Sequence, residues 1–384
     1  MNQVKPFLSF LFAFLFGFSG LALAQHDDHG DKSKLDIAGT IFGHVADAHS
    51  IHIVGDVSIP LPVIAYKSGE GLSVFSSSHF GHHFHEAAGA DGKPVQVSES
   101  YNGFHLEKGI KEKLVADDGS KVIDFSITKN VVSMIIAVIL ILTIFISMGN
   151  KYKRNGAMKA PSGMQNALEP VITFMRDEVA KPSIGKHYAR FMPLILTIFF
   201  FIWINNMLGL LPFGFNFTGN IAVTLSLAVV SFIVMIASGN KHFWGHLLNP
   251  PGVPFGVKII LVIIEIISLF IKPIALTIRL FANMLAGHII ILMVIMLIFI
   301  FSMAMSPAVG VVFTPISLVF AIFMFTLELL VAAIQAFIFA NLTAVFIGQA
   351  VEEAHHHDEA HDTYHPVNPE TGQAYEVSPK DIIA

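Results

Sequence analysis

Residues 257–303 read VKIILVIIEIISLFIKPIALTIRLFANMLAGHIIILMVIMLIFIFSM. This run is far longer than the roughly 20 residues that cross a bilayer, and as one helix it would reach about 70 Å. A second apolar run, residues 314–348, follows a turn near residues 306–310. Such runs must tilt, kink or lie partly along the membrane, and Pro273 is the expected bend in the first. The sequence therefore predicts two long, strongly tilted helices that form a hairpin.

The composition of the whole chain agrees with a membrane protein. Of its 384 residues, 54% are hydrophobic and 13% are charged, which is too little charge to cover the surface of a soluble domain. The net charge of −5 is small and scattered, so we expect no nucleic-acid partner. The chain has no cysteine, which excludes disulfides, thiolate metal sites and thiol catalysis.

Shorter apolar segments precede the hairpin, at residues 131–148, 191–211 and 221–238. Lys151, Lys153 and Arg154 follow the first of them, so the positive-inside rule places that loop in the cytoplasm. We therefore expect an all-α polytopic membrane protein with about five membrane helices.

The connections between these segments also carry predictions. Residues 164–181 mix apolar and charged positions around Pro170, which is typical of an interfacial helix on the cytoplasmic face. Residues 212–219 form a short outer turn, and residues 242–254, with Pro250-Pro251, form a cytoplasmic loop.

The two ends of the chain are different in character. Residues 1–24 resemble a bacterial signal peptide ending at Ala22-Leu23-Ala24, the alternative being a first transmembrane helix. Residues 25–129 are polar and His-rich; short strands are plausible there, but we expect a small, loosely structured extracytoplasmic domain. Its cluster at residues 81–85 could bind zinc or nickel, but the spacing is not compelling and we expect no metal site. Residues 349–384 form an acidic, His-rich cytoplasmic tail.

Charged residues are rare in the hairpin. Between residues 259 and 348 the charged side chains are Glu265, Lys272, Arg279 and Glu328. A charge at the bilayer centre costs roughly 2.5–3.5 kcal/mol on insertion scales. Such residues usually mark an ion path, and the alternative is that they only hold helices together.

The helical spacing of these residues predicts which of them share a helix face and which lie opposite one another in the hairpin. Glu265, Lys272 and Arg279 repeat every seven residues, so they share one stripe with Asn283 if the helix continues through Pro273. Folding the hairpin about residue 308 brings two further pairs to similar depths. His288 would then lie opposite Glu328, and Gln335 would lie near the level of Arg279.

This pattern indicates proton transfer. A neighbouring His and Glu can exchange protons near neutral pH. Arginine cannot give up its proton in proteins, so Arg279 cannot relay one. It can instead block leakage and attract a carboxylate on another subunit.

Four ordered elements between residues 130 and 348 resemble ATP synthase subunit a. The central one, RLFANMLAGH at residues 279–288, resembles the signature R-L-F-x-N-x-x-A-G-E/H. Glu265 with Ser268 and Lys272-Pro273 matches upstream, and ELLVAAIQAFIF at residues 328–339 matches the last helix. NNMLGLLP at residues 205–212 resembles N-x-x-G-L-x-P.

The chain departs from this family in two ways. Many bacterial members have Glu where His288 stands and His where Glu328 stands, and the exchange of both suggests that the two positions act as a unit. The His-rich N-terminal extension and its signal peptide are absent from the core family.

The resemblance implies a stator subunit in the bacterial inner membrane, with a c-subunit ring, b subunits of the peripheral stalk, protons and lipid as partners. It implies no cofactor and no catalytic residue, because ATP is made on the soluble head. An outer half-channel would contain His288, Glu328 and Glu265. Arg279, helped by Gln335 and Asn283, would separate it from a cytoplasmic exit.

Two other functions fit parts of the pattern. A secondary cation or proton transporter with a His-rich metal-binding domain would usually show internal repeats, and the sequence shows none. A structural membrane anchor would need Arg279 for assembly but not for coupling.

Overall fold

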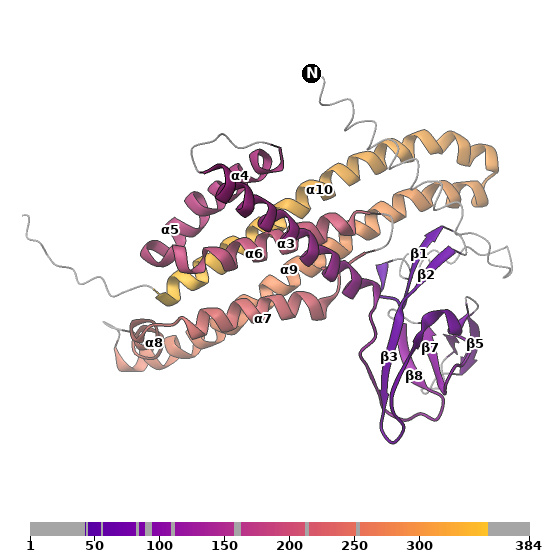
Figure 1. Cartoon of the computed structure of the whole chain (residues 1–384), viewed down its shortest axis with the longest axis horizontal. Helices are drawn as coiled ribbons and strands as arrows, with labels where there is room; N and C mark the ends of the chain where they lie inside the picture. Colours follow the sequence, from indigo (N-terminus) through magenta and orange to yellow (C-terminus); the bar gives the residue numbers. More distant parts are fainter. Residues whose placement is uncertain are drawn as a thin grey trace, which may run out of the picture.

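The structure is a computed structural model of the chain (Figure 1). It describes residues 43, 45–54, 57–81, 84–88, 94–108, 112–156, 163–211, 215–250 and 254–351. The expected signal peptide, His82 and His83, and the tail beyond residue 351 lie outside the described residues.

Residues 50–124 form a β domain. Its strands pair in antiparallel fashion into sheets of order β1-β2, β4-β3-β9 and β5-β6-β7-β8. The strands are β1 (Ser50–Val54), β2 (Val57–Pro60), β3 (Pro62–Lys67), β4 (Gly71–Ser76), β5 (His85–Ala88), β6 (Pro94–Val97), β7 (Phe104–Lys108), β8 (Glu112–Ala116) and β9 (Val122–Asp124), with a 3-10 turn η1 (Ser77–Phe80).

A hydrophobic core holds this domain together. Val63 and Ala65 alternate inward on β3 and pack with Phe80, Phe104 and Leu106. Phe80 and Phe104 are almost completely buried, and burying such side chains contributes roughly 1.5–3 kcal/mol each. The expectation of a loosely structured N-terminal domain is therefore wrong. The period-2 alternation that builds the core is present in the sequence, but the high histidine and glycine content obscures it.

The rest of the described chain is helical. The elements are α3 (Lys129–Asn155), α4 (Met164–Phe174), a π-helical turn η2 (Met175–Ala180), α5 (Lys181–Ile184), a 3-10 turn η3 (Gly185–His187), α6 (Tyr188–Gly209), α7 (Ile221–Ala237), α8 (Lys241–Leu248), α9 (Phe255–Ala304) and α10 (Pro307–Val351).

The membrane helices agree with the predicted fold class. Within the described residues, four helices are long and apolar enough to span a membrane, and a fifth span exists if α7 and α8 count as one bent helix. The bend between α7 and α8 is 101°. Most of the expected loop at residues 242–254 is therefore helix, because Lys241–Leu248 can form two turns before Pro250-Pro251 stops them.

Helices α9 and α10 form the predicted hairpin, which turns at Met305-Ser306 (Figure 1). Helix α9 continues through Pro273, where a bend was expected. Thr277 donates a hydrogen bond from its hydroxyl to the Pro273 carbonyl at 2.8 Å, one turn away. The stripe of polar residues predicted for this helix thus lies on one uninterrupted element.

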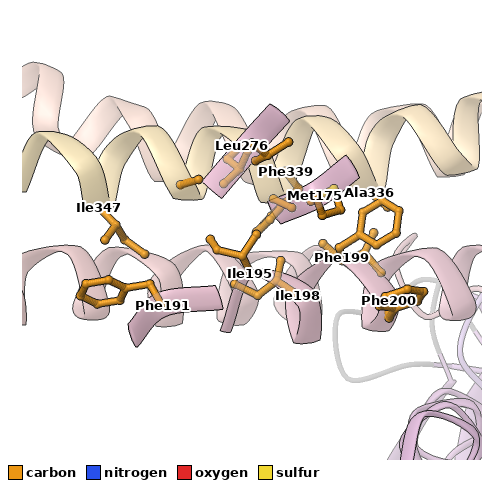
Figure 2. Close-up of a cluster of buried hydrophobic side chains, with 14 of the residues drawn as sticks. Met175, Phe191, Ile195, Ile198, Phe199, Phe200, Leu276, Ala336, Phe339 and Ile347 are labelled. Carbon is orange, nitrogen blue, oxygen red and sulfur yellow. The ribbon is translucent and has the colours of Figure 1, made fainter. Parts of the chain in front are cut away.

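The main membrane core lies between α6 and α10. Figure 2 shows Phe191, Ile195 and Phe199 of α6 beside Phe339 and Ile347 of α10. Small residues let α10 approach its neighbours closely, as is typical of membrane helix interfaces. They are the fully buried Ala332, Ala336, Ala340 and Ala344, each one turn from the next.

The segment predicted as an interfacial helix also contributes to this core. Met175 and Val179 on η2 are almost completely buried in the cluster with α6 and α10. At the end of α10, Gly348 lies so close to α5 that a Cβ atom there would overlap the backbone carbonyl of Ser183. The segment is therefore packed against the helical bundle.

Candidate functional site

The structure brings His288 of α9 and Glu328 of α10 together. The imidazole Nδ1 lies 3.5 Å from a carboxylate oxygen, and the side chains are 8% and 4% exposed. This separation permits an ion pair but no aligned hydrogen bond, and neither Glu328 oxygen has a hydrogen-bond partner. A buried polar group without a hydrogen-bond partner is costly, so the placement of this pair inside the hairpin requires an explanation.

Gly287 makes this approach possible. A Cβ atom at position 287 would lie 2.9 Å from one oxygen of Glu328 and 3.0 Å from its carboxyl carbon. Glycine thus leaves room for the carboxyl group directly against the backbone of α9. The signature gives this position as glycine, but its role becomes apparent only when α10 is in place.

Gln335, two turns along α10 from Glu328, pairs with Asn283. The Asn283 amide donates to the Gln335 side-chain oxygen at 2.9 Å, while the Gln335 amide nitrogen is buried without a partner. Between the two levels, Asn206 of α6 donates to the carbonyl of Ala332 at 3.3 Å and accepts from Thr218 at 2.7 Å. Two separate hydrogen-bonded groups, Asn283–Gln335 and Thr218–Asn206–Ala332, therefore lie along α10 beyond the pair.

Arg279 lies on a different face of α9. It is nine residues from His288, which is two and a half turns, so the two side chains leave the helix in opposite directions. Its side chain is exposed and makes no hydrogen bond or ion pair within the part of the chain that the structure describes. The structure joins Gln335 to Asn283, one turn of α9 from Arg279, and the prediction that Gln335 lies near the level of Arg279 stays a prediction.

Glu265 and Lys272 lie toward the start of α9. Lys272 donates to the Gln349 side chain at 2.9 Å near the end of α10. Glu265 is half-buried and lies 23 residues from His288, which corresponds to roughly 35 Å along a continuous helix. Of the six predicted site residues, the structure therefore joins His288 with Glu328 and Asn283 with Gln335, but it joins neither Arg279 nor Glu265 to these pairs by a hydrogen bond or ion pair.

A second buried polar cluster lies where the β domain meets α3. The buried His49 contacts Glu112 through Nδ1 at 3.4 Å and Asp124 through Nε2 at 3.2 Å. Two residues earlier, Asp47 accepts a 2.9 Å hydrogen bond from the Thr128 hydroxyl and a 3.2 Å hydrogen bond from the backbone N–H of Asn130. Asp47 therefore caps the start of α3. Sequence reasoning missed this cluster because its members are 63 to 83 residues apart.

The charges in this cluster stabilise one another. Burial alone would lower the pKa of His49, but hydrogen bonds to Asp124 and Glu112 outweigh it and raise that pKa to about 9. Burial likewise would raise the pKa of Asp124, but its bond with His49 prevails and the pKa falls to about 2. The pKa of Glu112 is lowered against its burial for the same reason. His49 is therefore a cation held between two carboxylates.

Val45, four residues before His49, packs against α9. Val45 is buried against Leu292 of α9, with Leu285 and Ile289 beside them. Leu285 and Leu292 lie about one turn before and one turn after His288 on this helix. Within the described residues, no group of three or more His, Asp or Glu side chains could hold a metal ion.

Comparison with known protein families gives two matches. Residues 131–348 match the family described as ATP synthase A chain. Residues 40–132 match a family described as Domain of unknown function (DUF8433). The first match contains the whole hairpin site, and the second contains the β domain and the start of α3.

Individual relatives carry the same name over the membrane part. ATP synthase subunit a of Chloroherpeton thalassium is 47% identical over 243 residues, or 62% of this chain and 70% of that protein. ATP synthase subunit a 2 of Prosthecochloris aestuarii is 46% identical, covering 62% and 72%. ATP synthase subunit a of Myxococcus xanthus is 41% identical, covering 66% and 81%. The chain belongs to the ATP synthase A chain family.

Proposed function

We propose that the chain is the proton-conducting stator subunit of an F-type ATP synthase. It provides two half-channels to the carboxylates of a c-subunit ring, with b subunits as its other membrane partners. The observation that carries the proposal is the arrangement of side chains on α9. The buried His288 contacts Glu328, while Arg279 is exposed on the opposite face of the same helix.

His288 and Glu328 handle the proton in the outer half-channel. An imidazole and a carboxyl group side by side can pass one proton between them and to water. Asn283 and Gln335 line the level between this pair and Arg279.

Arg279 separates the two routes. Its guanidinium keeps its proton at any physiological pH and attracts a deprotonated ring carboxylate that passes by. Each transferred charge gains about 2.3 kcal/mol per 100 mV of membrane potential, and this gain drives ring rotation.

The resemblance implied that Glu265 lies in the outer half-channel with His288 and Glu328; we propose instead that Glu265 belongs to the cytoplasmic half-channel. The roughly 35 Å between it and His288 along α9 is too long for direct proton exchange. Its neighbour on the same stripe, Lys272, is joined to the last turn of α10 through Gln349. In the bacterial inner membrane, the β domain would lie outside the cytoplasm and the C-terminal tail inside it.

Replacing Arg279 with Ala tests the proposal. Arg279→Ala is expected to abolish proton-driven ATP synthesis in membrane vesicles while an assembled complex is still recovered. Ile278→Ala is a matched control, because Ile278 is a comparably exposed neighbour on α9. Synthesis by the Arg279 variant at the level of the Ile278 variant would rule out the stator function, and loss of assembly alone would favour a structural anchor.

A further inference from the structure

The three-stranded sheet β4-β3-β9 is apolar on both sides. Its inner side contributes Val63 and Ala65 to the core of the domain. Its outer side, here called the outer face, consists of Ile64, Tyr66, Leu72, Val74, Ile123 and Phe125.

Strand register places these side chains together. Tyr66 pairs with Leu72 on one side and with Ile123 on the other, while Ile64 pairs with Val74 and accepts the backbone amide of Phe125. Leu72, Val74 and Phe125 are 64%, 63% and 62% exposed. Sheets that face water on one side normally alternate apolar and polar residues. An apolar outer face therefore indicates that something covers it.

The sheet leads directly into the membrane. Strand β9 ends at Asp124 and α3 starts at Lys129, and the backbone between them continues to pair with β3, since Ile127 donates to the Pro62 carbonyl at 3.1 Å. A few residues further on, α3 begins its own exposed apolar surface, which includes Ile135, Val138 and Ile139. The outer face is thus continuous along the chain with a surface that lies in lipid.

The domain is also fixed in orientation. Asp47 caps α3, His49 joins this segment to β8 and β9, and Ile51 and Leu61 pack on Phe215 beside α3. In Figure 1, β3 stands on the side of the domain next to the helices, and β5, β7 and β8 stand on the far side. The outer face of β3 points away from the four-stranded sheet and so toward the side of the membrane helices.

We infer that the outer face rests on the bilayer surface from which α3 starts. Leu72, Val74, Ile123 and Phe125 would enter the boundary between headgroups and acyl chains. Tyr66 would lie at headgroup depth, the usual place for tyrosine in membrane proteins. Lys121, exposed two residues before Ile123, is positioned to reach lipid phosphates. In this arrangement the β domain lies on the membrane surface beside the start of α3.

The absence of cysteine from the chain allows a direct test. Leu72→Cys and Val74→Cys, labelled with an environment-sensitive fluorophore, report on the outer face. Gln96→Cys is the matched control, because Gln96 is an exposed strand residue on the four-stranded sheet. The variants are incorporated in the whole complex, whose other subunits lack reactive cysteines, and reconstituted with nitroxide-labelled phospholipid.

Interfacial segments insert roughly 5–10 Å, so labels at positions 72 and 74 should be quenched at least about twofold more than the label at 96. Equal quenching at the three positions would overturn the inference. So would a photo-crosslinker at position 72 that joins another protein subunit instead of lipid, since the outer face would then be a protein interface.

Discussion

At the scale of single residues, α9 places the Arg279 guanidinium and the His288–Glu328 pair on opposite faces. Nine residues turn the helix by two and a half turns, so Arg279 and His288 occupy the same helix without facing each other. This separation matters because a guanidinium within contact distance of Glu328 would hold its carboxylate in the charged form. The geometry leaves Glu328 free to contact His288 alone.

The exchange of residues at the pair gives the first prediction. The variants His288→Glu and Glu328→His are each expected to lower proton-driven ATP synthesis by about 100-fold, a typical loss for a positioned proton-transfer group. Because one imidazole and one carboxyl group suffice in either order, the double variant should recover several-fold over both single variants. The measurement is the rate of proton-driven ATP synthesis in membrane vesicles that carry each variant. A double variant no more active than the single ones would mean that the residues do not act as a unit.

Gly287 gives a second prediction. The Cβ atom of Gly287→Ala would meet the Glu328 side chain, which can swing aside, so the hairpin should assemble with the carboxyl group displaced from His288. Proton-driven synthesis should fall by about 10- to 100-fold, as expected for a misplaced reactive group. Gly256→Ala in the same helix is the control, because a Cβ atom there has no neighbour within 4 Å. Equal activity of the two variants would contradict the assigned role of Gly287.

At the scale of elements, the contacts between α9 and α10 are not symmetric about a single residue of the turn. The midpoint of His288 and Glu328 is residue 308, that of Asn283 and Gln335 is 309, and that of Lys272 and Gln349 is 310.5. Sequence spacing predicted the first pair because it lies close to the turn. It missed the Asn283–Gln335 contact because the offset farther away depends on how closely α10 packs through Ala332 and Ala336.

Local sequence patterns predict the elements of the membrane part but not how these elements pack. The long helices, their turn and the charged positions follow from hydropathy and spacing alone. The burial of Met175 beside α10 does not, because a local pattern of mixed polarity cannot distinguish an interfacial helix from one packed on a bundle. The His49 cluster also could not be predicted, since it joins residues from three distant parts of the chain.

The contact between α5 and α10 gives a third prediction. The Cβ atom of Gly348→Ala would overlap the Ser183 carbonyl, which is backbone and cannot move aside easily. Overpacking of this kind costs about 1–3 kcal/mol, and we expect a lower thermal unfolding temperature of the complex in detergent. Gly149→Ala in α3, where a Cβ atom meets nothing within 4 Å, should leave that temperature unchanged. An unchanged Gly348 variant would show that the close approach is not required.

At the scale of the whole molecule, the His49 cluster links the β domain to the membrane part and makes that link sensitive to pH. The pKa of His49 is raised from 6.5 to about 9, so its stabilising effect is complete below pH 6.5 and is lost as the pH rises through about 9. This shift corresponds to on the order of 3 kcal/mol.

His49→Gln tests this link. In thermal unfolding or proteolysis of the β domain, the stability that the unmodified complex has over the variant should shrink on going from pH 6.5 to 9.5, because His49 loses its charge. His85→Gln, which alters an exposed histidine on β5, should behave like the unmodified complex. An identical pH dependence in all three would rule out His49 as the origin.

The cap that Asp47 places on α3 also has a consequence for the order of events during synthesis. Asp47 and the amide of Asn130 that it caps are 83 residues apart, and nearly the whole β domain lies between them. Asp47 leaves the ribosome first, whereas its partner appears only as α3 is being delivered to the membrane. The top of this helix can therefore be completed only after the β domain has been synthesised and has folded against it. Maturation of the membrane part should thus wait for folding of the N-terminal domain.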